Sequence, residues 1–328
     1  MNAVQSPSGS HSAHVASHAL AVVFDAPEKL SLSQVELVRP DDDDVVVDVL
    51  WSGISTGTER LLWSGRMPPF PGMGYPLVPG YESVGRIRSV GINSDYKPGE
   101  SVFVPGSRGF KDVRGLFGGA AAQLVVPGAR TIRVDEALGE RSVLLALAAT
   151  AYHAIASNTA ELPDLIVGHG VLGRLLARLI IAVGGEPPTV WERNSSRLSG
   201  AVGYPIADPA NDARRDYRVI CDVSGDASLL DTLIGRLAPG GEIVLAGFYS
   251  DPLTFTFPPA FMREAKIRVA AEWQPPDLAD AKSLIDSGAL SLDGLITHRA
   301  DAAHAADAYR TAFGDPTCLK MVLDWRSC

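Results

Sequence analysis

The sequence has few cysteines and no long apolar run, and both shortages exclude classes of protein. Its cysteines are Cys221, Cys318 and Cys328. So small and odd a set makes a poor disulfide framework, fits a reducing cytoplasm and excludes a zinc lobe built from four cysteines. No apolar segment approaches the ~20 residues of a membrane-spanning helix. We therefore expect a cytoplasmic protein without an integral membrane segment.

Basic residues are also scarce relative to acidic ones. Lys and Arg total 29, and Asp and Glu total 38, which gives a net charge of −9. This balance argues against nucleic acid as a partner. The first residues carry no basic segment followed by an apolar one, so we expect no signal peptide. Residues 1–18 are interpreted as a flexible tail.

What the chain does have is enough apolar material and length for about two domains. The first 150 residues predict β-strands, for example at Ala19–Phe24 and Val45–Trp51, where Val and other apolar residues dominate. Residues 65–80 contain too many Pro and Gly for a helix or a strand, and they predict an irregular loop. Near the C-terminus, Leu319–Leu323 predicts a final strand that returns to the first domain.

Beyond residue 140, strands and helices alternate. Leu165–Val167 predicts a short buried strand, and apolar residues at i, i+3, i+4 and i+7 predict an amphipathic helix after it. A later helix is expected to place Leu237 on its apolar face, and Phe255 and Phe257 are interpreted as strand residues. The alternation implies a doubly wound parallel sheet of the Rossmann type. Its further strands are expected at Thr189–Trp191, Arg218–Val223 and Glu242–Gly247.

A glycine loop between the first of these strands and its helix indicates a dinucleotide cofactor. Gly168, Gly170 and Gly173 fit the pattern G-x-G-x-x-G, and Glu192 ends the next predicted strand. The glycines permit a tight turn, a close approach of the backbone to a pyrophosphate and close helix packing. Glu192 can accept hydrogen bonds from both ribose hydroxyls and would repel a 2′-phosphate, so NAD is favoured over NADP.

Two arginines near Glu192 weaken this preference, because an arginine can hold a 2′-phosphate. His169 is interpreted as a loop residue with no catalytic part. The residues expected around the cofactor are Gly168, His169, Gly170, Val171, Leu172, Gly173, Glu192, Arg193, Arg197, Thr150, Ser224, Ala246, Gly247 and Phe248.

Motifs spread over nearly the whole chain resemble the medium-chain dehydrogenase/reductase superfamily. They are Gly53-Ile54-Ser55, residues 78–85, Lys97–Val102, the glycine loop and Leu237–Gly241. The resemblance implies a GroES-like catalytic domain made of residues 19–150 and 288–328, and a Rossmann domain over residues 151–287. It also implies a homodimer joined at the edge strands of the Rossmann sheets, here near Leu253–Phe257.

The departures from the superfamily concern its catalytic zinc. Zinc-dependent members carry a cysteine at Ser55, a histidine at Tyr81 and a cysteine near Ala148, and of this set Glu82 alone is kept. A serine, a phenol and an alanine do not make a tetrahedral zinc site. We therefore expect no metal and no metal-polarised alkoxide.

A closer resemblance is to zinc-free members of the superfamily in bacteriochlorophyll biosynthesis. It implies NAD-dependent oxidation of the 3-(1-hydroxyethyl) group of a bacteriochlorophyllide to 3-acetyl. It also allows a location peripheral to photosynthetic membranes. The stretches that carry it are Ser52–Glu82, Gly115–Ala121, Val167–Leu179, Leu237–Tyr249, Phe257–Pro275 and Leu290–Arg299.

Without zinc, a side chain must take the hydroxyl proton. Tyr81 and Ser55 stand at the superfamily's metal-ligand positions, so the resemblance places them near the reacting carbon. A phenol with its ordinary pKa near 10 is a poor base, so Tyr81 would need a lowered pKa or a partner such as His153. Thr56 is a further candidate, and Glu82 is expected either to orient its neighbours or to form an ion pair.

A bacteriochlorophyllide is a flat, mostly apolar macrocycle with a carboxylate, so its pocket should be apolar and aromatic with a few cations. The residues expected to contact it are Trp63, Arg66, Met67, Phe70, Met73, Tyr75, Phe117 and Trp273. Two alternatives stay open: a zinc-free NADPH-dependent quinone or enone reductase, and a pigment- or dinucleotide-binding protein without activity.

Overall fold

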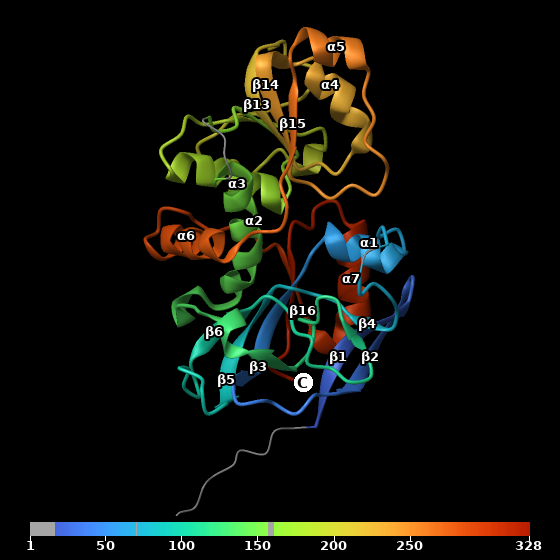
Figure 1. Ribbon diagram of the computed structural model, residues 1–328, viewed down its shortest axis with the longest axis vertical. Coiled ribbons are helices and arrows are strands. Elements are labelled where there is room, and N and C mark those ends of the chain that lie inside the picture. The colour runs from blue at the N-terminus through green and yellow to red at the C-terminus, as the bar shows by residue number, and fades with distance from the viewer. Residues whose placement is uncertain (1–16, 70, 157–160) are drawn as a thin grey trace, which may run out of the picture.

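Alternating apolar residues in the first part of the chain build the sheets of one domain, the lower one in Figure 1. The computed structural model describes residues 17–69, 71–156 and 161–328. Within these ranges, one sheet has the order β2-β1-β4-β7 and the other the order β16-β17-β3-β5-β6-β9, with β8 also paired to β3. Their bounds are β1 His18–Ala26, β2 Lys29–Glu36, β3 Asp44–Ile54, β4 Leu77–Val78, β5 Ser83–Val90, β6 Ser101–Val104, β7 Arg114–Gly115, β8 Gln123–Pro127 and β9 Ile132–Arg133.

The C-terminal segment completes this domain. Helix α7 (Ala305–Gly314) precedes β17 (Met321–Asp324), and β17 pairs antiparallel with β3 on one side and parallel with β16 (His298–Asp301) on the other. The predicted return of the chain is therefore confirmed. Its consequence is that side chains from the last 30 residues reach the end of β3.

The upper domain holds the predicted doubly wound sheet. Six parallel strands among the described residues follow the order β12-β11-β10-β13-β14-β15, so the chain starts in the middle and winds outward in both directions. Helices α2 (Leu145–Ala156) and α6 (Pro275–Asp286) lie between the two domains (Figure 1). The strands are β10 Leu165–Val167, β11 Thr189–Trp191, β12 Ile206–Ala207, β13 Tyr217–Asp222, β14 Leu237–Leu245 and β15 Lys266–Val269, and the helices of the domain are α3 Val171–Ala182, α4 Leu230–Ile234 and α5 Phe257–Met262.

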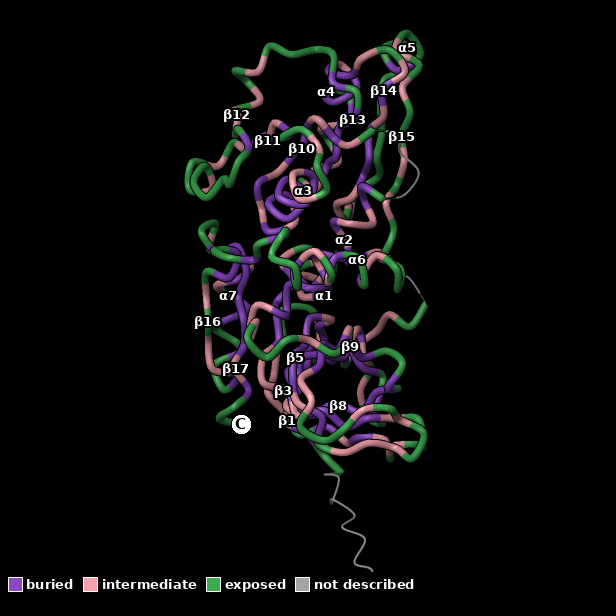
Figure 2. The backbone as a smooth tube through the Cα atoms, turned by 90° about the vertical axis from the view of Figure 1, so that its left-hand side faces the viewer, coloured by how far each residue is buried: buried purple, intermediate pink, exposed green. Residues whose placement is uncertain are grey.

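Buried residues, the purple parts of the backbone in Figure 2, occur in both domains. One core cluster lies in the catalytic domain and includes Phe24 and Tyr309, and another joins α2 and α3 to the Rossmann sheet. Across the described ranges, no helix has the length and apolar character needed to cross a bilayer.

Two predicted elements differ from the structure. Leu237 begins β14 and does not lie on a helix, because α4 ends at Ile234 and Gly235 follows it. Phe255 lies in a loop and Phe257 begins α5, whose first turn takes the two prolines that follow. Proline fits a first helical turn, where its missing N–H costs no hydrogen bond. The outer strand is β15, so the edge expected near Leu253–Phe257 lies further along the chain.

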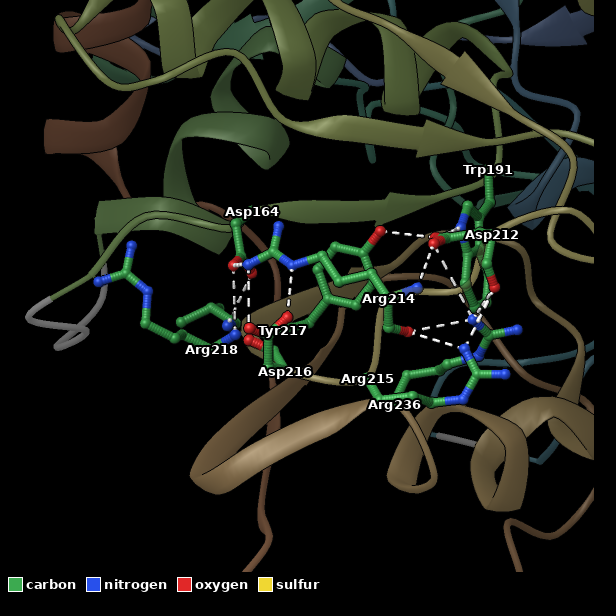
Figure 3. A network of polar contacts seen from close by, with 10 residues as sticks. Asp164, Trp191, Asp212, Arg214, Arg215, Asp216, Tyr217, Arg218 and Arg236 are labelled. Atoms are coloured by element: carbon green, nitrogen blue, oxygen red, sulfur yellow. Dashed lines mark hydrogen bonds and ion pairs between the residues drawn. The ribbon is translucent and has the colours of Figure 1, made fainter.

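The connection from β12 to β13 contains no helix among its described residues, although a helix usually covers the sheet there. A polar network takes that place (Figure 3). Asp212 Oδ2 accepts hydrogen bonds from Trp191 Nε1 and from the Tyr217 hydroxyl, each at 2.6 Å. Arg236 donates to backbone carbonyls of the loop, and Arg214 pairs with Asp164.

Candidate active site

Ser55 and Tyr81 meet where two neighbouring strands of the catalytic domain adjoin. Ser55 follows β3 and Tyr81 precedes β5, and these strands are paired up to Ser52 and Ser83. The Ser55 Oγ and the Tyr81 hydroxyl are 2.6 Å apart. The side chain of Thr58, on the short helix α1 (Thr58–Ser64), lies close enough to the Tyr81 hydroxyl to favour the ionised phenol. A direct hydrogen bond thus joins Ser55 and Tyr81, with Thr58 beside them.

Burial raises the pKa of Tyr81 well above its ordinary value, and the carboxylate of Glu82 raises it further. The phenol is therefore protonated at neutral pH and is not the lowered-pKa base that the sequence required. Its ring packs edge-on against Phe117, with ring centroids 5.5 Å apart. Because the phenol keeps its proton at neutral pH, Tyr81 can accept a proton only if it passes its own to Ser55 or Thr58 in the same step.

Glu82 forms a buried ion pair with Lys320. The Lys320 Nζ lies 2.6 and 2.9 Å from the two Glu82 oxygens and also donates to the Ile54 carbonyl at 3.1 Å. The exposed fraction of these side chains is 0 % for Glu82 and 2 % for Lys320. Burial raises the pKa of Glu82, and the ammonium of Lys320 opposes that rise. A Cβ at Gly53 would lie 2.1 Å from a Glu82 oxygen, so the pair requires glycine there.

A second buried carboxylate, Glu59, lies on the other side of Ser55. Its Oε1 accepts the Ser55 backbone N–H at 2.9 Å and its Oε2 accepts the Tyr309 hydroxyl at 2.7 Å. Glu59 is fully buried. Burial raises the pKa of Glu59 to about 7.

The residues at the superfamily's zinc positions do not fit a zinc ion. Ser55 and Tyr81 bond to each other, and Glu82 is saturated by Lys320. Over the described ranges, no three His, Cys, Asp or Glu side chains converge to hold a metal. Zinc in proteins is held by thiolates, imidazoles and carboxylates. Two hydroxyls bonded to each other and a carboxylate paired with lysine do not form such a set, so no step of the reaction is assigned to a metal.

The other two predicted catalytic residues are His153 and Thr56, and Thr150 was predicted to contact the cofactor. His153, on α2, places its Nδ1 2.8 Å from Asp277 of α6. Thr56 is partly exposed in the turn before α1. The hydroxyl of Thr150 donates to the Ala146 carbonyl within α2. The structure therefore brings together Ser55, Tyr81 and Glu82, but not His153.

The glycine loop fits a dinucleotide pyrophosphate. Gly168 has φ of +107°, and a Cβ at Gly173 would lie 1.9 Å from the Gly168 carbonyl oxygen. A Cβ at Gly170, by contrast, would meet no atom within 4 Å, so the backbone at the N-terminus of α3 is open to a ligand. Helix N-termini bind phosphates through free backbone N–H groups and the helix dipole. Val171 and Leu172 form the first turn of α3.

Glu192 faces this loop. Its oxygens accept the backbone N–H groups of His169 and Asn194 at 3.1 and 2.7 Å. The His169 ring is bonded to the Arg197 carbonyl and the Tyr204 hydroxyl, and burial lowers its pKa. The imidazole thus holds the loop after Glu192 in place.

The ends of β13 and β14 bring the remaining cofactor candidates next to the glycine loop. A Cβ at Gly168 would touch Ser224 at 3.5 Å, and one at Gly247 would lie 3.1 Å from the backbone of Gly225. The backbone N–H groups of Ala246 and Gly247 donate to Asp222. Phe248 is half exposed beside them. These residues share the carboxyl edge of the sheet, where doubly wound folds bind ligands.

Five of the eight residues predicted to contact the macrocycle, Phe117 among them, pack in or against the core of the catalytic domain. The Trp63 ring contacts Phe24, Met67 is buried, and the Tyr75 hydroxyl donates to the Leu62 carbonyl. Met73 packs on the same core. Phe70 lies outside the described residues. Their contact with a substrate stays a prediction.

The other three substrate candidates occupy different places. Phe117 packs on Tyr81, as described above. Arg66 donates to Ser250 and Asp251 of the Rossmann domain at 3.0 and 3.3 Å. Trp273 lines a groove of about 590 Å³ between the two domains, together with Ile132 and Leu278.

Three functional residues escaped the sequence reasoning. Lys320 and Tyr309 come from the C-terminal segment and reach the site only through the pairing of β17 with β3. Arg174, in the middle of α3, donates to the carbonyls of His169, Arg197 and Ser199 and fastens the loop after Glu192. Arg174 carried a signal, because Arg174 and Arg178 are the two charged residues of a helix that is otherwise apolar. No pattern in the sequence around Lys320 or Tyr309 could have identified them as site residues.

Comparison with known proteins gives two close relatives. The 2-desacetyl-2-hydroxyethyl bacteriochlorophyllide A dehydrogenase of Rhodobacter capsulatus is 58 % identical, over 93 % of this chain and 98 % of that protein. The protein of the same name from Cereibacter sphaeroides is also 58 % identical, over 94 % and 98 %. Residues 41–136 match the family model described as an alcohol dehydrogenase GroES-like domain.

Solved structures agree with the fold at low sequence identity. L-idonate 5-dehydrogenase from Escherichia coli superposes with a TM-score of 0.82 at 18 % identity, over 94 % of this chain and 98 % of that one. Acetophenone reductase from Geotrichum candidum, solved in complex with NAD, gives a TM-score of 0.81 at 19 % identity, over 95 % and 98 %. Both confirm the two-domain fold of the medium-chain dehydrogenases.

Proposed function

The chain belongs to the family of the 2-desacetyl-2-hydroxyethyl bacteriochlorophyllide A dehydrogenases, and from this premise we propose that it oxidises the hydroxyethyl group of a bacteriochlorophyllide to acetyl. One structural observation carries the proposal. A connected pair of hydroxyls, Ser55 and Tyr81, stands where zinc-dependent relatives would place metal ligands. The chain therefore offers a proton acceptor for an alcohol without offering a metal site.

In this reaction the alcohol carbon loses a hydride and its oxygen loses a proton. A bound nicotinamide dinucleotide supplies the hydride acceptor. The Ser55–Tyr81 pair relays the proton: the hydroxyl that takes it gives up its own proton in the same step, across a separation of 2.6 Å, and the released proton passes on to solvent water. Lys320 bonds the carbonyl just before Ser55 and holds that peptide group in place. Phe117, packed on Tyr81, is the residue best placed to contact the macrocycle.

The same proposal names NAD as the dinucleotide. Glu192 directly follows β11 beside the glycine loop and disfavours a 2′-phosphate by charge repulsion. The two arginines that could offset this are engaged elsewhere. Arg197 Nε donates to the Pro316 carbonyl at 2.9 Å, and Arg193 lies 3.7 Å from Asp226.

The test is anaerobic incubation of the purified protein with the hydroxyethyl bacteriochlorophyllide and either NAD or NADP. The absorption band of the pigment and the reduced dinucleotide are followed together. We expect a red shift matched one-for-one by NADH, with slower turnover on NADP. Pigment that binds unchanged would contradict the proposal, and so would activity confined to NADPH and quinones.

Ser55→Ala and Tyr81→Phe then test the proton acceptor. Each should lower kcat by about a hundredfold or more, because positioned acid–base groups contribute 10²–10⁴-fold. Tyr96→Phe is the matched control, since the Tyr96 hydroxyl donates to the Thr131 carbonyl elsewhere in the same domain. Equal losses of kcat in all three variants would contradict the assignment of the proton transfer to Ser55 and Tyr81.

We further propose a homodimer joined at the free edge of β15. Val269 and Ile267 of this strand, and Phe257, Phe261 and Met262 of α5, are exposed beside a groove of about 620 Å³. An unpaired, apolar strand edge is a surface that proteins cover. Light scattering should give the mass of a dimer, and Val269→Lys should yield a monomer. Ile92→Lys, at an exposed apolar residue far from β15 in sequence, is the control.

Peripheral binding to photosynthetic membranes is part of the same proposal, and co-sedimentation with vesicles tests it.

A further inference from the structure

Glu59 has no part in the proton transfer just described, yet its carboxylate is buried at a considerable cost in desolvation free energy. It is fully buried and its two oxygens face two donors, the Ser55 backbone N–H and the Tyr309 hydroxyl. A buried carboxylate without a salt-bridge partner is costly unless its hydrogen bonds have a purpose. Its position one residue after Thr58, and bonded to the backbone of Ser55, suggests what that purpose is.

The peptide group between Ile54 and Ser55 is held at both polar atoms. Its carbonyl accepts a hydrogen bond from Lys320 Nζ at 3.1 Å, and its N–H donates to Glu59 at 2.9 Å. With both ends bonded, the plane of this peptide cannot rotate without breaking a buried hydrogen bond. The Ser55 side chain starts from the next atom of the chain, so its direction toward Tyr81 is fixed as well.

We propose that Glu59 is a positioning residue: by accepting the Ser55 N–H it holds the Ser55 hydroxyl against Tyr81, and Tyr309 holds Glu59 in turn. The inference rests on the proposed function, which makes Ser55 and Tyr81 the proton acceptor. It assigns α7 a role in the reaction, because Tyr309 is its link to the active site. Lys320, also in the C-terminal segment, completes the clamp from the opposite side.

The clamp requires Glu59 to be ionised. An ionised Glu59 accepts a charge-assisted hydrogen bond from each partner, whereas a protonated Glu59 keeps only a neutral acceptor for the Ser55 N–H and must donate to the Tyr309 hydroxyl, so both bonds are weaker. The charged and titratable groups that face it are Tyr309 from α7, Glu82 and Tyr81 beside β5, and Lys320 before β17. Burial raises the pKa of Glu59 to about 7, with Glu82 adding to the rise and Lys320 opposing it. The clamp therefore loosens as the pH falls through neutrality.

The pH dependence of kcat tests this. The wild-type protein should lose kcat on the acid side with a midpoint near 7. Glu59→Gln keeps the shape of the side chain but does not titrate, so this limb should disappear, and kcat should fall about tenfold while KM for NAD is unchanged. Tyr309→Phe removes one donor to the carboxylate and should move the limb to higher pH. Tyr96→Phe should leave the profile as it is.

A second measurement separates this inference from the proposed function. Hydrogen exchange of the backbone around Ser55 is followed at one pH in the absence of substrate. In Glu59→Leu, which removes the acceptor altogether, and in Tyr309→Phe the Ser55 amide should exchange several-fold faster than in the wild type. If the pigment is not oxidised but this acceleration is seen, the clamp stands and the proposed reaction fails. If exchange is unchanged, or if Glu59→Gln keeps the acid limb, the clamp is overturned whatever the activity.

Discussion

The buried cluster behind Ser55 and the network beside the Rossmann sheet use the same chemistry in different surroundings. In the first, Lys320 and Glu82 are 2 % and 0 % exposed. In the second, Arg214 and Asp216 are 39 % and 77 % exposed, although Asp212 beneath them is largely buried. Water can replace a partner lost from the second region, but it has no access to the first.

This difference in solvent exposure indicates that the two regions have different roles. The network of Figure 3 covers the sheet where a crossover helix is absent, and its polar groups serve a loop at the surface. The cluster behind Ser55 places two carboxylates and an ammonium inside the core, where apolar residues would pack without the cost of desolvation. Such groups indicate function, here the orientation of the hydroxyls that take the proton.

The largest expected effect is that of Lys320→Met. Removing one partner of a buried pair leaves an uncompensated charge and costs about 3–5 kcal/mol of unfolding free energy. Because the pKa of Glu82 is already raised from its ordinary 4.5 and would rise further, stability in this variant is lost as the pH increases. Urea unfolding should therefore show a larger loss at pH 8 than at pH 5. Adding Glu82→Gln should recover part of it, and a loss independent of pH would show that Glu82 is not the charge left behind.

An intermediate effect is expected for Asp212→Asn in the network. The amide would turn a donor toward the Trp191 and Tyr217 donors, at about 1–3 kcal/mol. Burial opposes ionisation of Asp212, but hydrogen bonds from Tyr217 and Trp191 prevail and lower its pKa below the ordinary 3.8. The wild-type advantage is therefore present at neutral pH and disappears in acid. Denaturation at several pH values measures this, and Asp216→Asn, at the exposed end of the network, is the control with little expected change.

The smallest effect is expected for Arg310→Gln on α7. Arg310 pairs with Asp307, and both side chains are largely exposed. Such pairs contribute below about 0.5 kcal/mol. Thermal unfolding should hardly change, and neither should kcat at any pH, although Arg310 adjoins Tyr309. A loss of activity in Arg310→Gln would mean that the position of the whole helix α7, and not Tyr309 alone, matters for the reaction. It would also mean that an exposed ion pair can affect activity as a buried one does.

The sequence predicted the elements whose signal is local. The glycine loop, Glu192 and the final strand could be placed from spacing and apolar patterns, because turns and strands follow from neighbouring residues. Leu237 and Phe257 were assigned to the wrong elements, since a short apolar run fits a helix and a strand equally well. Of the site, Ser55 and Tyr81 could be named from the family's positions, but their direct hydrogen bond could not.

By itself the sequence determined the alternation of strands and helices and the dinucleotide loop, because each depends on residue types at short spacing. The division into two domains and the loss of the zinc ligands were implied by the resemblance to the superfamily. Only the tertiary structure decided what stands in place of the metal. Lys320 and Tyr309 lie more than 200 residues from Glu82 and Glu59. They meet because β17 pairs with β3, and no local pattern marks a partner that long-range strand pairing alone brings into contact.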